Sequence, residues 1–321
     1  MKTLEEVIGI VQKEIKEINY LGEPKELYEP MNYVLQLGGK RLRPVTVLLA
    51  ANLFSDNISS AIPAAKAIEV FHNFTLVHDD IMDDAPLRRG KATVHEKWND
   101  NVAILSGDSL LIKAYDHFLE GNYVNLSGIL STFNKTALEV CEGQQLDMNF
   151  ETRSDVTIDE YINMIRLKTS VLVGGAMKIG ALLAQSSAED AQHIYDFGVN
   201  VGLAFQLQDD YLDCFGDPEK FGKQVGGDII SNKKTFMMLK ALELDKSGEL
   251  NNWVEKETFD SVEKVNAVKV LYKALKVDSL AFELMDKYYS KGLESLSAIS
   301  IDNEKKTMLK AFAAQLMKRS H

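Results

Sequence analysis

The chain has 321 residues, of which 45% are hydrophobic and 26% are charged, and its formal net charge is −11. It is long enough to bury a large core, and its acidic total argues against a nucleic-acid partner. Cys141 and Cys214, the only cysteines, lack the spacing of a disulfide framework or zinc site. No stretch approaches the roughly 18 apolar residues of a transmembrane segment, and the N-terminus lacks a signal-peptide core, so we expect a cytoplasmic protein.

Helical periodicity extends along nearly the whole chain. A helix in the first twenty residues is followed by one that should stop at the Gly38–Gly39 pair, and Pro44 and Pro63 suit the first turns of the next two. The segment Val171–Leu183 is apolar nearly all round, which is typical of a helix buried in a bundle. The predicted helices cover residues 4–18, 24–37, 44–54, 63–84, 96–120, 125–150, 158–185, 188–215, 234–243, 258–275, 278–297 and 303–319.

No segment shows a convincing strand pattern, and no low-complexity tract or linker divides the chain. We therefore expect an all-α fold in a single domain that spans residues 1–321. The most irregular segments are 85–95 and 216–233, and each directly follows a cluster of aspartates. Loops beside a rigid scaffold are where binding groups concentrate.

Both aspartate clusters end an apolar helix and share the pattern DDxxD. The first contains Asp79 and Asp83, and the second contains Asp209 and Asp213. Residues four apart share one helix face, so the carboxylates stack where the helix end already carries negative charge. Carboxylate clusters suit Mg²⁺, which takes one or two carboxylates and completes its shell with water and substrate phosphates. Two such clusters predict several Mg²⁺ ions, three per active site, around a diphosphate.

Basic residues accompany each cluster. They include Lys40 and Arg43 after the paired glycines, where a helix N-terminus favours anions, and Arg88 and Arg89, whose guanidinium groups suit bidentate phosphate binding. The alternative for the arginines is a set of surface ion pairs with the neighbouring aspartates, worth about 0–1 kcal/mol each. Lys223 and Lys233 lie in the long loop after the second cluster, and Lys168 with Thr169 precedes an apolar helix segment, where a buried lysine needs a partner. The alternatives are a solvated connector for the loop and a lysine that reaches the surface. The apolar helices around these charges suggest a substrate with a hydrophobic tail, such as a prenyl diphosphate.

Four motifs together resemble those of the trans-isoprenyl diphosphate synthases, or polyprenyl synthetases. They occur in the family's order over almost the whole chain and read GGKRLRP, LVHDDIMDDAPLRRGKATVH, FQLQDDYLD and GGDIISNKKT. The resemblance implies a helical bundle of the isoprenoid synthase type around a central hydrophobic cavity, and normally a homodimer. It also implies Mg²⁺-dependent condensation of isopentenyl diphosphate with a dimethylallyl, geranyl or farnesyl diphosphate.

The resemblance also implies roles for individual residues. Asp79, Asp83 and Asp209 match direct magnesium ligands, with Asp80, Asp210 and Asp213 in supporting positions. The pocket for isopentenyl diphosphate is matched by Lys40, Arg43, His72 and Arg89, and the groups that hold the allylic diphosphate by Arg88, Lys168, Lys223 and Lys233. Thr169 and Gln206 match the polar groups that steady the allylic cation. The roles of Arg41 and Asp84 are left open.

Product length should depend on side chains one or two turns before Asp79. Phe71, Phe74 and Thr75 occupy these positions, and a phenylalanine there predicts a chain of fifteen to twenty carbons. The first motif also lacks the two-residue insertion of typical bacterial farnesyl synthases, so we favour geranylgeranyl diphosphate, with farnesyl diphosphate or a longer product as alternatives. The phenylalanines are also compatible with plain core packing.

Two other functional classes share parts of this pattern. A terpene cyclase has one DDxxD cluster but normally a different second motif, and it acts on a single diphosphate. A non-catalytic regulatory subunit usually loses one aspartate motif or the basic pocket, whereas this chain keeps both. A purely structural bundle would leave the costly charges unexplained.

Overall fold

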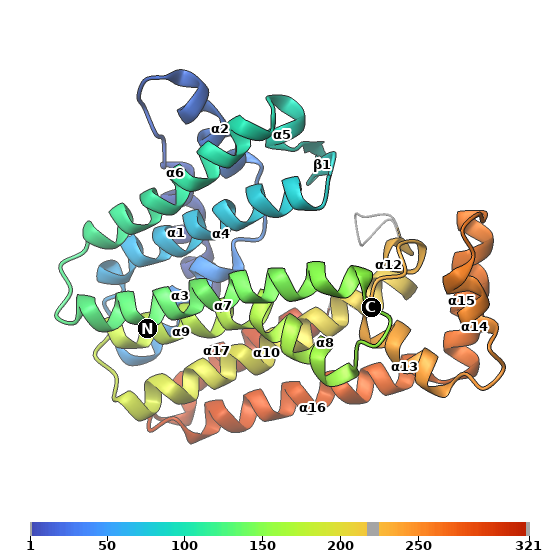
Figure 1. The fold of residues 1–321 in the computed structure, drawn as a ribbon. Helices are drawn as coiled ribbons and strands as arrows, with labels where there is room; N and C mark the ends of the chain where they lie inside the picture. Colours follow the sequence, from blue (N-terminus) through green and yellow to red (C-terminus); the bar gives the residue numbers. More distant parts are fainter. Residues whose placement is uncertain (1, 217–224, 319–321) are drawn as a thin grey trace. The chain divides into compact units, whose positions relative to one another are not determined.

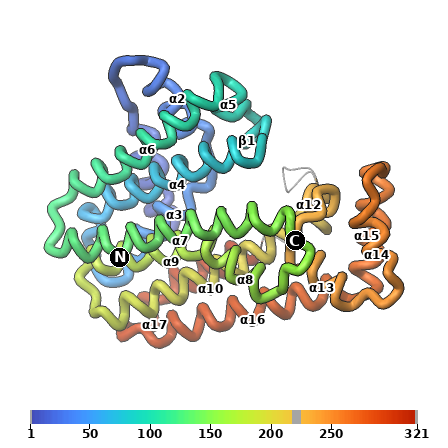
Figure 2. Tube along the Cα trace, viewed as in Figure 1, coloured from blue at the N-terminus to red at the C-terminus, as the bar shows by residue number. Residues whose placement is uncertain are grey.

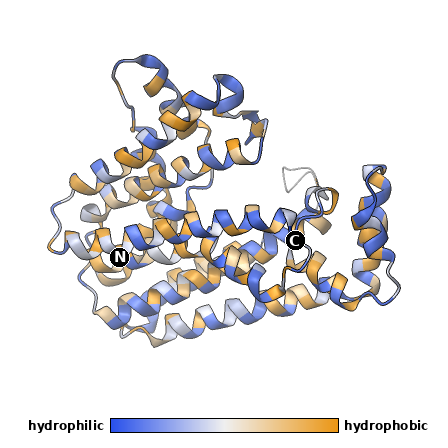
Figure 3. Cartoon of the chain, in the orientation of Figure 1, coloured by the Kyte–Doolittle hydropathy of each residue, from blue (hydrophilic) through white to orange (hydrophobic). Residues whose placement is uncertain are grey.

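The structure is a computed structural model that describes residues 2–216 and 225–318 (Figures 1 and 2). Within these residues the chain is helical almost throughout, so the all-α prediction is confirmed. Helices of the described part carry hydrophobic and hydrophilic residues side by side along their length (Figure 3). No helix among the described residues is long and apolar enough to span a membrane.

The chain divides into two compact units. The first comprises Met1–Asn134, Gly175–Tyr195 and Ile299–Met308, and the second comprises Lys135–Gly174, Asp196–Ala298 and Leu309–His321. Four helices, α7, α9, α10 and α17, contribute residues to both units. A single domain over residues 1–321 stays a prediction.

The first unit contains the N-terminal helices and the only strands that the described residues form. In chain order its complete elements are α1 (Leu4–Lys16), α2 (Lys25–Gln36), α3 (Leu42–Phe54), η1 (Ser59–Ala61), α4 (Ile62–Met82), β1 (Leu87–Arg88), β2 (Lys91–Ala92), α5 (Val94–Lys97) and α6 (Asp100–Leu119). Helices α4 and α6 pack along each other (Figure 1).

Large aromatic side chains fill the core of the first unit. Phe71 of α4 and Phe118 of α6 both pack against Phe133, with ring centroids 5.1 and 4.9 Å apart. All three rings are buried. Ring contacts of this kind stabilise a core by about 0.5–1.5 kcal/mol each beyond the area they bury. The α4 helix, which ends in the first aspartate cluster, is therefore firmly anchored.

The hairpin of β1 and β2 corrects the expectation that the chain has no strand. Leu87 pairs with Ala92 and Arg88 with Lys91, and the turn residues Arg89 and Gly90 both have positive φ. Two-residue hairpin turns require this mirror-image backbone geometry. Strands of two residues are too short to show an alternating pattern, which is why periodicity missed them.

The second unit is built around the long helices of the C-terminal half. The remaining elements of the described residues are α7 (Leu126–Thr152), α8 (Ile158–Ile165), the π-helix η2 (Arg166–Ser170), α9 (Val171–Leu183), α10 (Ala188–Phe215), α12 (Gly227–Ile230), α13 (Phe236–Leu244), α14 (Glu249–Glu255), α15 (Ser261–Ala274), α16 (Val277–Ala298) and α17 (Asn303–Met317).

Three details of these elements differ from the sequence-based expectation. The helix predicted over residues 158–185 is interrupted by η2, and the short helices α12 and α14 had not been predicted. The apolar helix α9 is buried along most of its length, as its composition indicated. A π-helical turn inside a helix often marks a functional position, and η2 contains Lys168 and Thr169.

Candidate functional site

The first aspartate cluster lies at the C-terminal end of α4. Asp79 and Asp80 belong to its last turn, and Asp83 is the C-cap, whose N–H donates to the carbonyl of Asp79 at 2.9 Å. Asp79 is half-buried and Asp83 is exposed. The last carbonyls of a helix lack intrahelical partners and carry partial negative charge, so this end of α4 favours a cation.

The middle carboxylate of this cluster is held by an arginine. Arg88 Nε lies 2.8 Å from each carboxylate oxygen of Asp80, and Arg88 Nη2 lies 2.6 Å from Oδ1. Asp80 is only 3% exposed, so its charge needs this partner. The pair agrees with a supporting position for Asp80. Whether Arg88 also binds a diphosphate stays a prediction.

The hairpin turn reaches the glycine loop between α2 and α3. Gly38 and Gly39 have φ values of 82° and 121°, which only glycine adopts without strain. Arg89 donates a hydrogen bond from Nη1 to the carbonyl of Gly38. A Cβ atom at Gly39 would lie 2.6 Å from Arg89 Cζ, so any other residue would push the guanidinium away. Arg89 is thereby brought to the loop that contains the exposed Lys40.

Positive charge gathers around His72 on α4. Arg43 Nη1 lies 3.0 Å from His72 Nε2. Burial, and then the charges of Arg43, Arg89, Arg88 and Arg41, hold the pKa of His72 well below its usual range. The imidazole is therefore neutral near pH 7, and its Nε2 accepts the hydrogen bond from Arg43. This cluster of arginines creates a local field that favours an anion.

Arg41, whose role the sequence left open, has a structural task. Its Nη1 donates to the carboxylate of Glu69 and its Nη2 to the carbonyl of Leu35. Glu69 is 1% exposed and also accepts a hydrogen bond from Asn73 Nδ2 at 3.1 Å. The buried network fixes the loop that precedes α3.

The second aspartate cluster lies on α10 and is tied to the π-helix by a chain of hydrogen bonds. Thr169 Oγ1 donates to Gln206 Oε1 at 3.3 Å, and Gln206 Nε2 donates to Asp210 Oδ1 at 3.0 Å. The hydroxyl of Tyr161 donates to the other oxygen of Asp210. Burial and the charge of Asp228 raise the pKa of Asp210 to about 7. Asp210 is thus a buried carboxyl group that is held by Tyr161 and Gln206.

The other two aspartates of this cluster are half-buried. Asp213 Oδ2 accepts a hydrogen bond from the backbone N–H of Asp228 at 3.0 Å, and its carbonyl accepts one from Gly226 N at 2.6 Å. These bonds join the end of α10 to the segment before α12. Asp209 itself is part of α10. The predicted diphosphate-binding residue Lys223 lies outside the described residues.

Two of the predicted lysines share one carboxylate that sequence reasoning missed. Asp147 Oδ2 on α7 lies 2.7 Å from Lys168 Nζ and 3.8 Å from Lys233 Nζ. Burial alone would raise the pKa of Asp147, but the two lysines lower it. The expectation that Lys168 needs a partner was therefore sound, and within the protein that partner is Asp147.

The π-helix that contains Lys168 depends on a glycine of α7. A Cβ atom at Gly143 would lie 2.2 Å from the backbone nitrogen of Lys168. The two backbones can approach so closely only because Gly143 has no side chain. Gly143 and Asp147 are one turn apart on α7, so one face of this helix contacts both the backbone and the side chain of Lys168.

The three residues predicted to set product length lie on α4 and differ in burial. Phe71 is 1% exposed and belongs to the aromatic core. Phe74 is half-buried and packs against His78, with ring centroids 4.8 Å apart. Thr75 is half-buried, and its hydroxyl donates to the carbonyl of His72 at 2.8 Å. Phe74 and Thr75 are therefore more exposed than Phe71.

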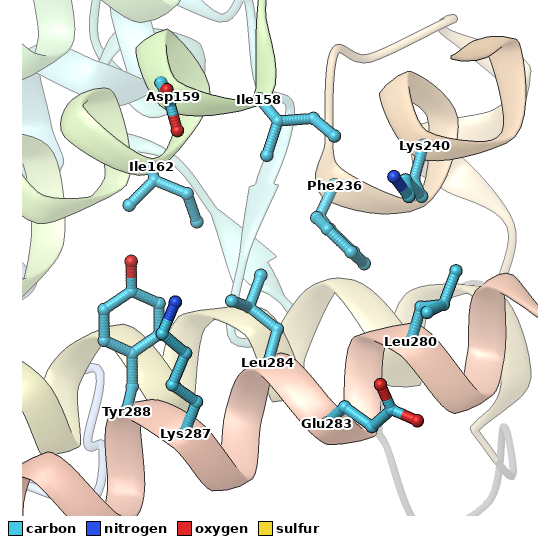
Figure 4. A pocket seen from close by; sticks show the side chains of 10 residues that line it. All are labelled: Ile158, Asp159, Ile162, Phe236, Lys240, Leu280, Glu283, Leu284, Lys287 and Tyr288. Carbon is cyan, nitrogen blue, oxygen red and sulfur yellow. The ribbon is translucent and has the colours of Figure 1, made fainter. Parts of the chain in front are cut away.

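A pocket of about 370 Å³ lies elsewhere in the second unit (Figure 4). Side chains of α8, α13 and α16 line it, among them Ile158, Ile162, Phe236 and Leu284. None of the predicted site residues lines this pocket. It is therefore not the candidate site described above.

Comparisons with known proteins identify relatives of this chain. A family model described as polyprenyl synthetase matches residues 24–275. The geranylgeranyl diphosphate synthase of Methanosarcina mazei is 40% identical over 97% of this chain and 95% of its own length. The geranylfarnesyl diphosphate synthase of Natronomonas pharaonis is 36% identical over the same shares. A crystal structure of a geranylgeranyl pyrophosphate synthase superposes with a TM-score of 0.95 at 47% identity and covers 100% of both chains.

Proposed function

The chain belongs to the polyprenyl synthetase family, and we propose that it condenses isopentenyl diphosphate with an allylic diphosphate to give geranylgeranyl diphosphate. The family predicted from the four motifs is confirmed, and so is the isoprenoid synthase type of fold. In the proposed reaction the allylic C–O bond breaks, a C–C bond forms to the double bond of isopentenyl diphosphate, and a proton is lost. The released diphosphate is the base to which that proton goes.

The observation that carries the proposal is the cationic cluster around His72. Arg43 and Arg89 both act on this neutral histidine, and Arg89 also contacts the glycine loop that precedes Lys40. A diphosphate supplies the negative charge that such a cluster favours. We assign Lys40, Arg43, His72 and Arg89 to isopentenyl diphosphate. Neutral His72 then carries its hydrogen on Nδ1, which lies 3.5 Å from Thr75 Oγ1.

A second group of cations is assigned to the allylic diphosphate. It comprises Arg88, Lys168, Lys223 and Lys233. The shared contact with Asp147 keeps Lys168 and Lys233 close together. A lysine placed in advance loses less side-chain entropy when a phosphate binds. Asp147 is thus assigned a positioning role.

Magnesium fits the chemistry of the aspartate clusters. The proposed ligands, Asp79, Asp83 and Asp209, offer only oxygen donors, and Mg²⁺ typically takes one or two carboxylates together with water and substrate phosphates. Among the described residues, neither aspartate cluster brings the ligand atoms of three side chains within 4.8 Å of one another. This suits a metal ion whose coordination shell is completed by the diphosphate. When bound, three Mg²⁺ ions would offset the charge that develops on the leaving diphosphate. Asp80, Asp210 and Asp213 hold the ligands in place.

The polar pair on η2 and α10 is assigned to the allylic cation. Thr169 donates its hydroxyl hydrogen to Gln206 Oε1, so the lone pairs of Thr169 Oγ1 and the second lone pair of Gln206 Oε1 remain for a positive carbon. The amide of Gln206 is fixed in this orientation by its bond to Asp210. Groups oriented before the reaction stabilise developing charge without reorganising.

The proposed product length rests on the relatives and on α4. The Methanosarcina mazei relative is named for a C20 product, and the Natronomonas pharaonis relative for a longer one. The half-buried Phe74 and Thr75 lie five and four residues before Asp79, respectively, and Phe71 lies a turn deeper. We assign these three side chains to the end of the tail cavity, with farnesyl diphosphate as the alternative product.

We also propose that the protein is a homodimer. Leu105, Ile112 and Leu119 of α6 are spaced seven residues apart and are 59%, 63% and 64% exposed. Residues seven apart follow one stripe of a helix, and an exposed apolar stripe of this kind is typical of an interface. A second copy of the chain is the occupant that family membership favours.

The test separates the two diphosphates kinetically. Arg89→Gln should raise the KM for isopentenyl diphosphate by at least about tenfold and leave the KM for the allylic substrate within about twofold, because a lost charged contact costs several kcal/mol. Lys168→Gln should do the reverse. Lys13→Gln, on the exposed face of α1, is the control and should change neither constant. Equal effects of both variants on both substrates would contradict the assignment.

A further inference from the structure

His95 of α5 is a buried side chain whose polar atoms lack partners. It is 9% exposed, and among residues 2–216 and 225–318 neither its Nδ1 nor its Nε2 finds a hydrogen-bond partner. A buried polar group without a partner costs about 1–3 kcal/mol. None of the roles assigned above uses His95. The imidazole therefore needs a partner that the described residues do not supply.

Two carboxylates converge on this imidazole. Ligand atoms of Asp84, His95 and Glu96 all lie within 4.8 Å of one another, and this is the only such group of three or more metal-binding side chains in the described part of the chain. Glu96 Oε1 lies 3.8 Å from His95 Nε2. Asp84 follows α4 with a φ of 47°, and the hydrogen bond from Thr93 N to Pro86 O at 3.2 Å closes the segment between them.

We propose that Asp84, His95 and Glu96 bind one divalent ion of the zinc type, separate from the magnesium ions assigned to the aspartate clusters. Imidazole nitrogen with carboxylate oxygen suits Zn²⁺ and its transition-metal neighbours, whereas Mg²⁺ prefers oxygen alone. Donors bonded at about 2.1 Å lie at most about 4.2 Å apart. The exposed side chains of Asp84 and Glu96 are free to close the remaining gap, and water completes the coordination.

The ion would link the residues on either side of the β1–β2 hairpin. Asp84 precedes the hairpin and His95 follows it, while Arg88 and Arg89 lie inside. A bond between the ends restricts the loop and thereby the two guanidinium groups. Binding of the ion does not depend on the proposed function; only its effect on the arginines does.

Metal content tests the proposal independently of activity. The full chain is stripped with a chelator, dialysed against about 5 mM Mg²⁺ to fill oxygen-only sites, and then titrated with Zn²⁺ alone. We expect one Zn²⁺ per chain in the wild type and at least tenfold weaker binding in Glu96→Gln and Asp84→Asn. Asp100→Asn, at the exposed start of α6, is the matched control and should bind like the wild type. Failure of the wild type to retain Zn²⁺, or equal binding by all four proteins, would overturn the proposal.

A structural readout locates the ion. Crystals soaked in Zn²⁺ with Mg²⁺ present should show an anomalous peak about 2.0–2.2 Å from a ring nitrogen of His95 and from the carboxylates of Asp84 and Glu96. A peak only at Asp79, Asp83 or Asp209 would contradict the site. The exposed Asp84 and Glu96 carry the test because replacing the buried His95 risks unfolding.

Discussion

Burial keeps two histidines of the first unit neutral, and this makes the stability of the protein depend on pH. The pKa of His72 is lowered by burial and by Arg43, and the pKa of His117 is lowered chiefly by burial. His117 lies between two partners, with Nε2 2.8 Å from the hydroxyl of Tyr20 and Nδ1 2.7 Å from Glu120 Oε1. In the unfolded chain both histidines regain a pKa near 6.5.

The sign of the pH effect follows from these lowered values. As the pH falls below about 6.5, the unfolded state binds protons before the folded state, so stability present at neutral pH is lost by up to about 1.4 kcal/mol per pH unit for each histidine. Urea unfolding at pH 7.5 and 5.5 measures this loss. His117→Gln should lose less between the two values than the wild type. His193→Gln, at a more exposed position on α10, should lose as much as the wild type, and an equal loss in all three proteins would refute the explanation.

Asp209 is the residue of the second cluster whose replacement should affect chemistry most selectively. Asp209→Asn keeps the shape of the side chain and removes one charge assigned to Mg²⁺. We expect kcat to fall by about 10²–10³-fold, as for loss of one group that stabilises transition-state charge, with little change in melting temperature. Glu189→Gln, on the exposed start of the same helix, is the control. Near-normal kcat in Asp209→Asn would exclude Asp209 as a ligand.

At the scale of single residues, the sequence revealed charges but not the partners that orient them. Asp210 was recognised from its motif and Lys168 from its position before an apolar helix segment, whereas Asp147 and Tyr161, which hold them, were not recognised. Asp147 is one acidic residue within a long helix, and the Tyr161 hydroxyl reaches Asp210 across 49 positions of sequence. Such pairings arise from packing between helices, which no local pattern encodes. A useful signal was present: a lysine that enters an apolar helix requires a carboxylate nearby.

At the scale of elements, the close packing of the π-helix against α7 depends on Gly143. Gly143→Ala places a methyl group 2.2 Å from Lys168 N, so one backbone has to move. We expect a loss of about 1–3 kcal/mol in unfolding free energy and a higher KM for the allylic substrate. Gly9→Ala in α1 has open space around the added methyl and should be neutral or stabilising by up to about 1 kcal/mol. Denaturant unfolding and steady-state kinetics of both variants decide the matter, and a Gly143→Ala protein as stable and active as the wild type would disprove the close contact.

The face of α4 before the first aspartate cluster should set product length. Phe74→Ala removes a half-buried ring, and we expect products longer than C20 with the reaction rate largely retained. Phe71→Ala instead empties a packed core and should cost about 3–5 kcal/mol of stability. Product chain lengths are resolved by mass spectrometry. An unchanged product from Phe74→Ala would contradict the assignment of Phe74 to the tail cavity.

Element boundaries were predictable where the local chemistry is strong. The glycine pair ends α2, Pro63 opens α4, and the apolar run of α9 is buried. The β1–β2 hairpin and the π-helix were missed because each is shorter than the window in which periodicity can be read. Both contain predicted site residues, and function tends to override regular local structure at such positions.

At the scale of the whole molecule, the exposed stripe of α6 predicts association of two chains. Ile112→Asp introduces a charge into this stripe and should shift the protein to a monomer in light scattering at micromolar concentration, because a buried unpaired charge costs several kcal/mol. Val270→Asp, at an equally exposed site on α15, is the control and should leave the mass unchanged. A wild type that is monomeric throughout, or an Ile112→Asp variant that remains dimeric, would contradict the proposed interface.

The central claim is the condensation itself, and analysis of the products tests it most directly. The purified chain is incubated with Mg²⁺, isopentenyl diphosphate and, in turn, dimethylallyl, geranyl or farnesyl diphosphate, and the products are resolved by mass. We predict chain-extended diphosphates that end at C20 and disappear when EDTA is added. A cyclic hydrocarbon would instead identify a terpene cyclase, and the absence of product from every starter would indicate a non-catalytic subunit.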